Sequence, residues 1–119
     1  MKFIFLSIIL INTFSLGASE SKVYFINLKD GDKVENPILI QFGLSGKGVA
    51  PAGVNKDNTG HHHLLIDVKA IDFSKPIPSS KNHLHFGGGQ TETSIELTSG
   101  EHELQLVLVI YITYLILPL

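Results

Sequence analysis

Apolar and polar residues alternate along much of the chain with a period of two, which is the period of a strand and not of a helix. Strand-like segments are found at residues 23–26, 38–44, 62–68, 83–86, 91–97 and 102–108. Turn-forming residues separate several of them, as in Asp30-Gly31 and Ser99-Gly100. Short strands divided by such turns, with no helical segment between them, predict an all-β domain that folds as a sandwich.

Two long connections interrupt this pattern. Residues 45–60 are polar and rich in Gly, Asn and Pro, and residues 71–81 carry Pro and Ser at several positions. Loops longer than about 12 residues without structure of their own are uncommon in small domains and are often functional. The 45–60 loop is therefore a candidate binding segment.

The N-terminal residues follow a third pattern. Lys2 precedes an apolar run, Phe3 to Ile11, that only Ser7 interrupts, and small residues follow at 15–19. This order predicts a secretory signal peptide, residues 1–19, cleaved after Ser19. A retained membrane anchor is the weaker interpretation, because a membrane-spanning helix needs about 20 apolar residues. Cleavage would leave an exported protein with one domain at 20–108.

Composition excludes several classes of protein. The net charge is −2 and the chain contains no Arg, so nucleic-acid binding, which requires dense phosphate neutralisation, is not expected. There is no Cys, so export brings no disulfide framework and no thiolate is available as a metal ligand. We also find no sequence motif of a known catalytic class, and we predict no catalytic residues.

Histidine carries the main chemical signal. Five of the six His lie in two short motifs, residues 60–63 and 83–85. Alternate residues of a strand share a face, so two His of each motif project together, and neighbouring strands would bring four imidazoles to one surface. Imidazoles without thiolates favour Zn or Cu. The predicted ligands are His61, His63, His83 and His85, with Asp67 in support as a residue that orients an imidazole.

Other interpretations of the same residues stay open. Paired His also hydrogen-bond to backbone, and the long 45–60 loop needs such partners, so a structural network is as well supported as a metal site. His62 is expected on the opposite face, with Leu64 and Ile66. A hydrolase with a His-bound metal and Glu92 as base is the least favoured alternative, because a solvated strand face explains Glu92 equally well.

Longer motifs resemble a known family. The segments Val49-Ala50-Pro51-Ala52-Gly53, Asn58 to Asp67 and His83 to Glu92 are similar to the signature of exported bacterial domains of unknown function, number forty-three ninety-nine. The resemblance covers about Val23 to Leu108. It implies a periplasmic or secreted domain with an immunoglobulin-like antiparallel β-sandwich and no established activity. The order of strand, Asp-Gly turn and Asn36-Pro37 also resembles the opening of such sandwiches.

The end of the chain departs from this family. Similar proteins continue after Leu108 with a Gly-Asp or Gly-Asn turn, a segment containing two further His, and a final strand, whereas this chain ends in the apolar residues 109–119. Back-translation of Val109 to Pro118, read one base upstream, is compatible with the family segment. We hypothesise a single-base slip near codon 109, which the nucleotide sequence tests. Residues 109–119 are then an aberrant tail, and the C-terminal strand is non-native.

These observations predict a non-enzymatic exported β-sandwich with a His-rich surface that binds a divalent transition metal. The alternative is an interaction module for an envelope protein or polymer, in which the 45–60 loop binds and the His are structural. Neither interpretation includes a stable membrane span after cleavage.

Overall fold

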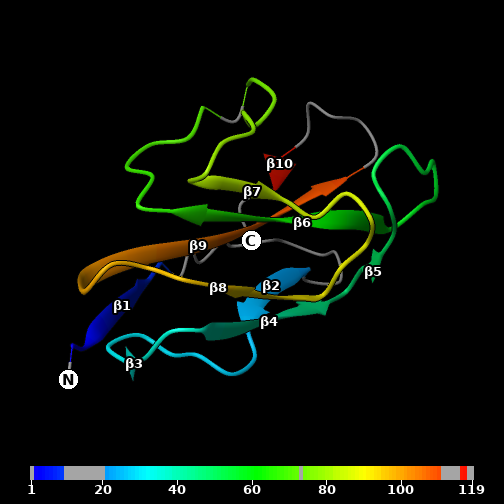
Figure 1. Ribbon diagram of the computed structural model, residues 1–119. Helices are drawn as coiled ribbons and strands as arrows, with labels where there is room; N and C mark the ends of the chain where they lie inside the picture. Colours follow the sequence, from blue (N-terminus) through cyan, green and yellow to red (C-terminus); the bar gives the residue numbers. More distant parts are fainter. Residues whose placement is uncertain (1, 10–20, 73, 111–115, 118–119) are drawn as a thin grey trace.

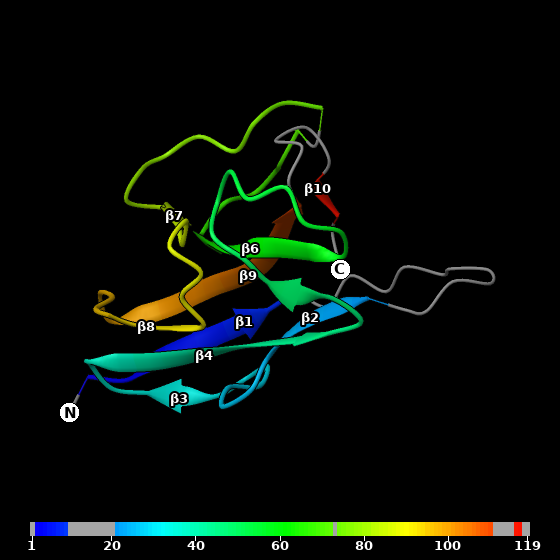
Figure 2. The same cartoon turned by 90° about the vertical axis from the view of Figure 1, so that its right-hand side faces the viewer.

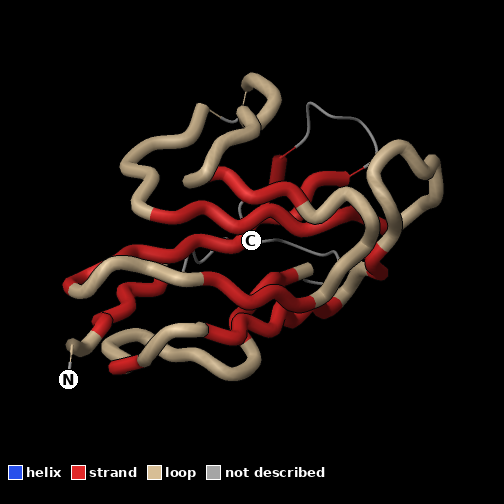
Figure 3. The backbone as a smooth tube through the Cα atoms, in the orientation of Figure 1, coloured by secondary structure: helices blue, strands red, loops and turns tan. Residues whose placement is uncertain are grey.

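The computed structural model describes residues 2–9, 21–72, 74–110 and 116–117. Strands and loops make up all of this part of the chain, without a helix (Figure 3). The strands are β1 (Ile4–Ile8), β2 (Lys22–Phe25), β3 (Lys33–Val34), β4 (Ile38–Ser45), β5 (Gly48–Val49), β6 (Thr59–Ile66), β7 (His83–His85), β8 (Glu92–Ile95), β9 (Gly100–Ile110) and β10 (Ile116–Leu117). The predicted all-β class is confirmed.

The strands form two sheets that pack face to face (Figures 1 and 2). The larger sheet has the order β3-β1-β9-β6-β5, with β7 also paired to β6 and β10 to β9, and the smaller one has the order β2-β4-β8. The smaller sheet is antiparallel, as predicted. The larger sheet is mixed, because β1 runs parallel to β9 and β5 runs parallel to β6. The domain is thus a β-sandwich, while its immunoglobulin-like connectivity stays a prediction.

Alternate residues of the two sheets form the main core between them. Leu64 and Ile66 of β6 face Ile40 and Phe42 of β4, and all four side chains are buried. Each apolar side chain of this size contributes about 1.5–3 kcal/mol when it is fully buried. The main core therefore fixes which face of β6 points inward.

The outer face of β6 is also covered. Leu65, Val107 and Val109 form a second buried cluster there, against which Ile77 of the β6–β7 connection packs. Figure 1 shows this connection on the side of β6 that faces away from the smaller sheet. All eight residues of β6 are consequently buried, including three consecutive His. The outer face is the one that carries His61 and His63.

Strand boundaries differ from the sequence pattern in three places. β6 begins at Thr59 because Gly48 and Val49 pair with Thr59 and Gly60, so the predicted 45–60 loop contains a short strand. β6 ends at Ile66 because Asp67 adopts a φ of 56°, which interrupts the strand. β9 extends past Leu108 to Ile110, since its last two residues still pair with β6.

The N-terminal apolar run also contributes a strand. β1 lies between β3 and β9, and its side chains Ile4 and Leu6 are buried in the main core. The predicted cleavage residues 15–19 lie outside the described part of the chain, as do 111–115 and 118–119 of the predicted tail. The described residues include no helical segment with the length and hydrophobicity that a membrane crossing requires.

Candidate metal centre

Pairing between β6 and β7 brings the two His motifs together. His63 lies directly opposite His85, and His61 is two residues from His63 on the same face. Alternation in the sequence predicted that neighbouring strands would bring the imidazoles to one surface. The register confirms this convergence for three of them. One nitrogen from each of His61, His63 and His85 lies within 4.8 Å of the others.

The spacing of these nitrogens suits a single metal ion. Nε2 of His61 and Nε2 of His63 are 3.1 Å apart. Two imidazole nitrogens that each lie about 2.0–2.1 Å from one tetrahedral zinc ion are separated by about 3.3 Å, so the observed distance is close to that of a ligand pair. The His85 ring stacks on His63 with centroids 4.6 Å apart and meets His61 edge-on at 4.9 Å.

Burial keeps the imidazoles of His61 and His63 neutral. Desolvation by burial, together with the neighbouring His85, lowers the pKa of His61. Desolvation, followed by the effects of His61 and His85, lowers the pKa of His63 to about 3. Metal ions bind the neutral form of imidazole, so both groups have their lone pairs available at neutral pH. Nδ1 of His63 is buried and has no hydrogen-bond partner among the described residues.

A cavity of about 320 Å³ opens beside the three imidazoles. Its walls come from the imidazoles, from β9 and from two loops, 52–53 and 76–79. The lining residues are Ala52, Gly53, His61, His63, Pro76, Ile77, Pro78, Ser79, His85 and Val109. No carboxylate is among them, so a metal held here would have three neutral protein ligands and a further position facing the cavity.

Gly87 leaves the space in which the His85 ring lies. A Cβ atom at Gly87 would be 2.7 Å from Cε1 of His85 and 3.0 Å from its Nε2. Contacts below about 3 Å require one group to move. The close approach of the His85 imidazole to the backbone therefore explains why Gly87, the first residue of the triple-Gly segment, is a glycine.

His83 and Asp67 are placed apart from this group. His83 is two residues from His85 in β7 and lies opposite Leu65. Its Nδ1 is 2.7 Å from Oγ of Ser80. Asp67 follows the end of β6 and contacts His102 and Glu103 instead. Of the four His and one Asp predicted from the sequence, the structure brings together His61, His63 and His85.

His102 and Asp67 form a second, structural pair. Nδ1 of His102 is 2.7 Å from Asp67 Oδ2, and its Nε2 is 2.7 Å from the carbonyl oxygen of Thr98. Desolvation alone would lower the pKa of His102, but the hydrogen bonds to Asp67 and Thr98 outweigh it and raise this pKa. A ring that bonds two acceptors is a doubly protonated donor. The alternating pattern does not predict this pair, because its partners are 35 residues apart in the chain.

Two further residues of the sequence analysis lie away from the cavity. His62 points into the main core, as expected, and its ring centroid is 5.1 Å from that of Phe42. Glu92 begins β8 on the smaller sheet, where it is exposed and pairs with Gln41. Glu92 is not among the lining residues, so the geometry offers no support for its role as a base at the His site.

Comparison with known proteins identifies the family. No curated protein and no solved structure matches the chain. The family model described as domain of unknown function DUF4399 matches residues 40–111, which include β6, β7 and the three clustered imidazoles. Since this match spans more than half of the chain, the protein belongs to the DUF4399 family, whose function is unknown.

Proposed function

We propose that this protein binds a divalent transition metal, Zn(II) or Cu(II), through His61, His63 and His85. The proposal rests on one observation, the convergence of three imidazole nitrogens within 4.8 Å beside a cavity. With no thiolate in the chain, imidazole ligation favours these two ions among the common divalent metals.

Hydrogen bonding within the described residues distinguishes this proposal from a structural role for the His. His83 and His102 each bond to a residue of a connecting loop, as a structural role requires. The side chains of His61 and His63 bond to each other instead, and Nδ1 of His63 has no partner there. Neither His61 nor His63 anchors a loop through its side chain, which favours a ligand at these imidazoles over loop anchoring.

The number of protein ligands indicates what kind of metal site this would be. Structural zinc sites have four protein ligands, whereas three protein ligands leave a position for an exchangeable water or small molecule. That position would face the cavity, which Pro76 and Pro78 help to line. Binding, transfer or sensing of the metal fits such a site better than a permanent structural role, because the ion can be reached from solvent.

Metal titration of the full chain tests the proposal. We expect zinc or copper to bind one site per chain, and we expect His63→Gln to weaken that binding by about a hundredfold. His83→Gln is the matched control, because it removes an imidazole from the same face of β7 that lies outside the group. Isothermal titration calorimetry gives the affinities, and the visible spectrum of bound Co(II) reports the coordination number.

The same titration has two outcomes that contradict the proposal. Equal affinity of the wild-type chain and His63→Gln would remove His63 from the site. An equal loss in His63→Gln and His83→Gln would instead indicate the four-His site expected from the sequence, and the three-ligand geometry would be wrong.

Export is a separate proposal. We infer that residues 1–19 direct the chain out of the cytoplasm and are removed, on the basis of the basic, apolar and small-residue order at the N-terminus. N-terminal sequencing of the protein recovered outside the cytoplasm should begin at Glu20. Recovery of a chain that still begins at residue 1 or 2 would contradict cleavage.

A further inference from the structure

β1 fills a site that is one strand wide. We call it the acceptor site and define its two edges as residues 31–34, which include β3, and residues 100–104 of β9. β1 runs antiparallel to β3, with Ile4 opposite Val34, and parallel to β9, with Ile4 opposite Gly100. In the described part of the chain, β3 is joined to the rest of the larger sheet through its pairing with β1.

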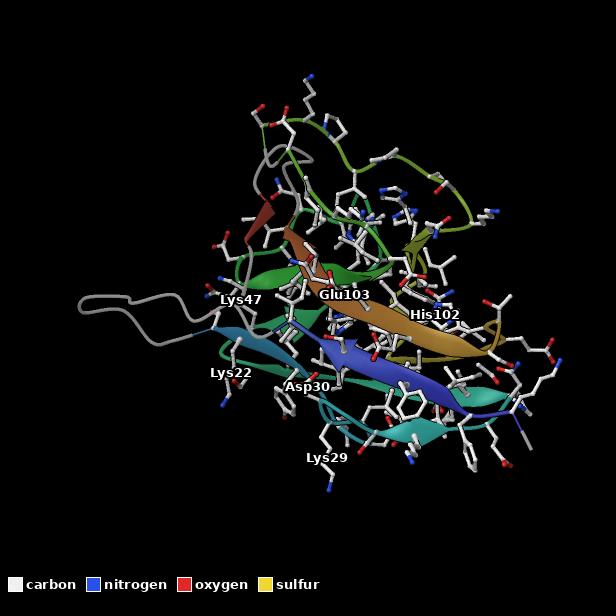
Figure 4. The ribbon with its side chains drawn as sticks, turned by 90° about the vertical axis from the view of Figure 1, so that its left-hand side faces the viewer. Lys22, Lys29, Asp30, Lys47, His102 and Glu103 are labelled. Carbon is white, nitrogen blue, oxygen red and sulfur yellow. The ribbon has the colours of Figure 1, made fainter. Side chains whose placement is uncertain are left out.

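Both edges of the acceptor site offer backbone hydrogen bonds. On the β3 side, Leu6 N donates to the carbonyl oxygen of Asp32 at 3.1 Å, and Gly31 N donates to the carbonyl oxygen of Leu6 at 3.0 Å. On the β9 side, Gly100 N donates to the carbonyl oxygen of Phe3 at 3.3 Å. Figure 4 shows β1 alongside β9 with Asp30 near its end, where Asp30 Oδ1 accepts from Ile8 N at 3.0 Å. An extended backbone is thus held from two sides.

The acceptor site also selects side chains. Ile4 and Leu6 are only 3% and 2% exposed and reach the main core, whereas Phe3 and Phe5 are 45% and 37% exposed. The Lys33 ammonium lies over both Phe rings, 5.4 and 5.2 Å from their centroids. Two apolar residues at alternate positions, with larger residues allowed between them, therefore define the sequence that fits.

Loss of β1 would leave this site open. Removal of residues 1–19 would free the β9 edge at residues 100–104, leave β3 without the strand it pairs with here, and expose the core that Ile4 and Leu6 cover. An open edge next to exposed core residues is a template for an added strand. Peptide recognition by strand addition uses the same two elements, backbone bonds for affinity and alternate pockets for specificity.

We propose that the acceptor site of the exported protein binds an extended segment of a partner protein, parallel to β9, with apolar side chains at two alternate positions. This inference rests on the export proposal and is independent of the metal. A second copy of the chain fits less well, because two β9 edges related by a twofold axis run antiparallel, whereas the site pairs a strand parallel to β9. With β3 in the position that it holds here, the site admits a single strand and not the edge of a complete sheet, because β3 lies on its far side.

Peptide capture by the full chain tests the proposal. The chain carrying Ile4→Ser and Leu6→Ser, here the emptied chain, keeps its length but loses the side chains that hold β1. The probe is a fluorescent peptide with the sequence of residues 2–9, and the control peptide carries Ser at the positions of Ile4 and Leu6. Fluorescence anisotropy should show the emptied chain binding the probe at least about a hundredfold more tightly than the control peptide. The wild-type chain, whose site is filled from within, should bind the probe at least about tenfold more weakly.

Cross-linking establishes where and in which direction the probe binds. The chain has no Cys, so a single introduced Cys gives a clean signal. β1 pairs Phe5 with Glu101 and Ser7 with Glu103. A probe with Cys at the Phe5 position should therefore form a disulfide with Glu101→Cys of the emptied chain, and much less with the matched variant Glu103→Cys.

Four results for a folded emptied chain would overturn the inference. They are equal binding of the probe to the wild-type and emptied chains, no binding by a folded emptied chain, a reversed cross-linking preference, and a stable dimer of the emptied chain that excludes the probe. If the emptied chain is unfolded alone, the probe must restore its cooperative unfolding transition, and failure to do so also overturns the inference. Zinc titration of the same samples separates the two proposals, because loss of metal binding with intact peptide capture would contradict the metal centre alone.

Discussion

We expect the metal-free protein to lose about 4 kcal/mol of its free energy of unfolding between pH 7 and pH 5. Two buried imidazoles cause this loss. Burial, and then the nearby His61, lowers the pKa of His62 to about 4, and burial with the neighbouring imidazoles lowers the pKa of His63 to about 3. Both groups titrate near 6.5 in the unfolded chain. The unfolded chain therefore takes up protons in a range of pH where the folded chain does not.

The sign of the effect follows from these values. A His whose folded pKa lies below its unfolded pKa contributes its full stability above pH 6.5, and loses it as the pH falls toward the folded value. Each pH unit between the two values costs about 1.4 kcal/mol per His. Two such groups together lose about 4 kcal/mol between pH 7 and pH 5, because both stay neutral in the folded chain over this range.

Urea unfolding with a chelator present, at pH 7.5, 6 and 5, measures the effect. His62→Leu is the informative variant, because it removes one of the two buried groups and should reduce the pH dependence by about half. At pH 7.5 the same substitution should stabilise the protein by about 1 kcal/mol, because both ring nitrogens of His62 are buried without a partner among the described residues. Stability that is constant from pH 7.5 to pH 5 would show that the imidazoles are not buried as neutral groups.

The pair of His102 and Asp67 acts in the opposite direction. The pKa of His102 is raised, so its contribution is complete below its unfolded pKa and is lost as the pH rises through the folded value. Burial raises the pKa of Asp67, but hydrogen bonds from Glu103 N and His102 outweigh this and lower it. Because Asp67 is partly exposed, solvent weakens the pair, and we expect the buried imidazoles to dominate the pH profile.

The local pattern was sufficient to predict which His of β6 share a face. Alternation in a strand placed His61 and His63 on one face, and the same rule placed His62 in the core with Leu64. The pattern does not show which residues of β6 and β7 lie opposite each other. Because His63 pairs with His85, His83 lies two residues beyond the cluster, opposite Leu65. Only the complete sheet decides between this register and one in which β7 is shifted by two residues.

Backbone conformation explains the failure at Asp67. Continued alternation would have kept Asp67 on the face of His63, but its φ of 56° ends the strand and directs its carboxylate to the backbone of Glu103. Asp tolerates this left-handed conformation better than most residues, yet the sequence contains no Gly or Pro there to signal it. The N-terminal strand was missed for another reason. An apolar run in Phe3 to Ile11 fits both an export signal and a buried strand, and its parallel partner lies nearly one hundred residues away.

We expect Gly60→Ala to destabilise the domain by about 3 kcal/mol, through a clash that no side-chain rotation relieves. A Cβ atom at Gly60 would lie 2.7 Å from the carbonyl oxygen of Val109 and 2.9 Å from Cγ of Leu108. The carbonyl belongs to β9, which pairs with β6 along seven residues from Gly60 to Ile66. Relief of the contact requires the two strands to separate at the end of β6 that carries His61, so the same variant should also bind zinc more weakly.

Gly48→Ala is the matched control for this prediction. Gly48 lies in β5 directly beside β6, but a Cβ atom there would meet only Cγ2 of Thr59 at 3.7 Å and Asn58 O at 4.0 Å, which are ordinary contacts. Urea unfolding at pH 7.5 should therefore separate the two variants, with a large loss for Gly60→Ala and less than about 1 kcal/mol for Gly48→Ala. Equal stability of the two would mean that β6 and β9 are not as closely paired at Gly60 and Val109. In that case the position of His61 beside His63 would lose its structural basis, since the pairing of Gly60 with Ile110 holds that end of β6 in place.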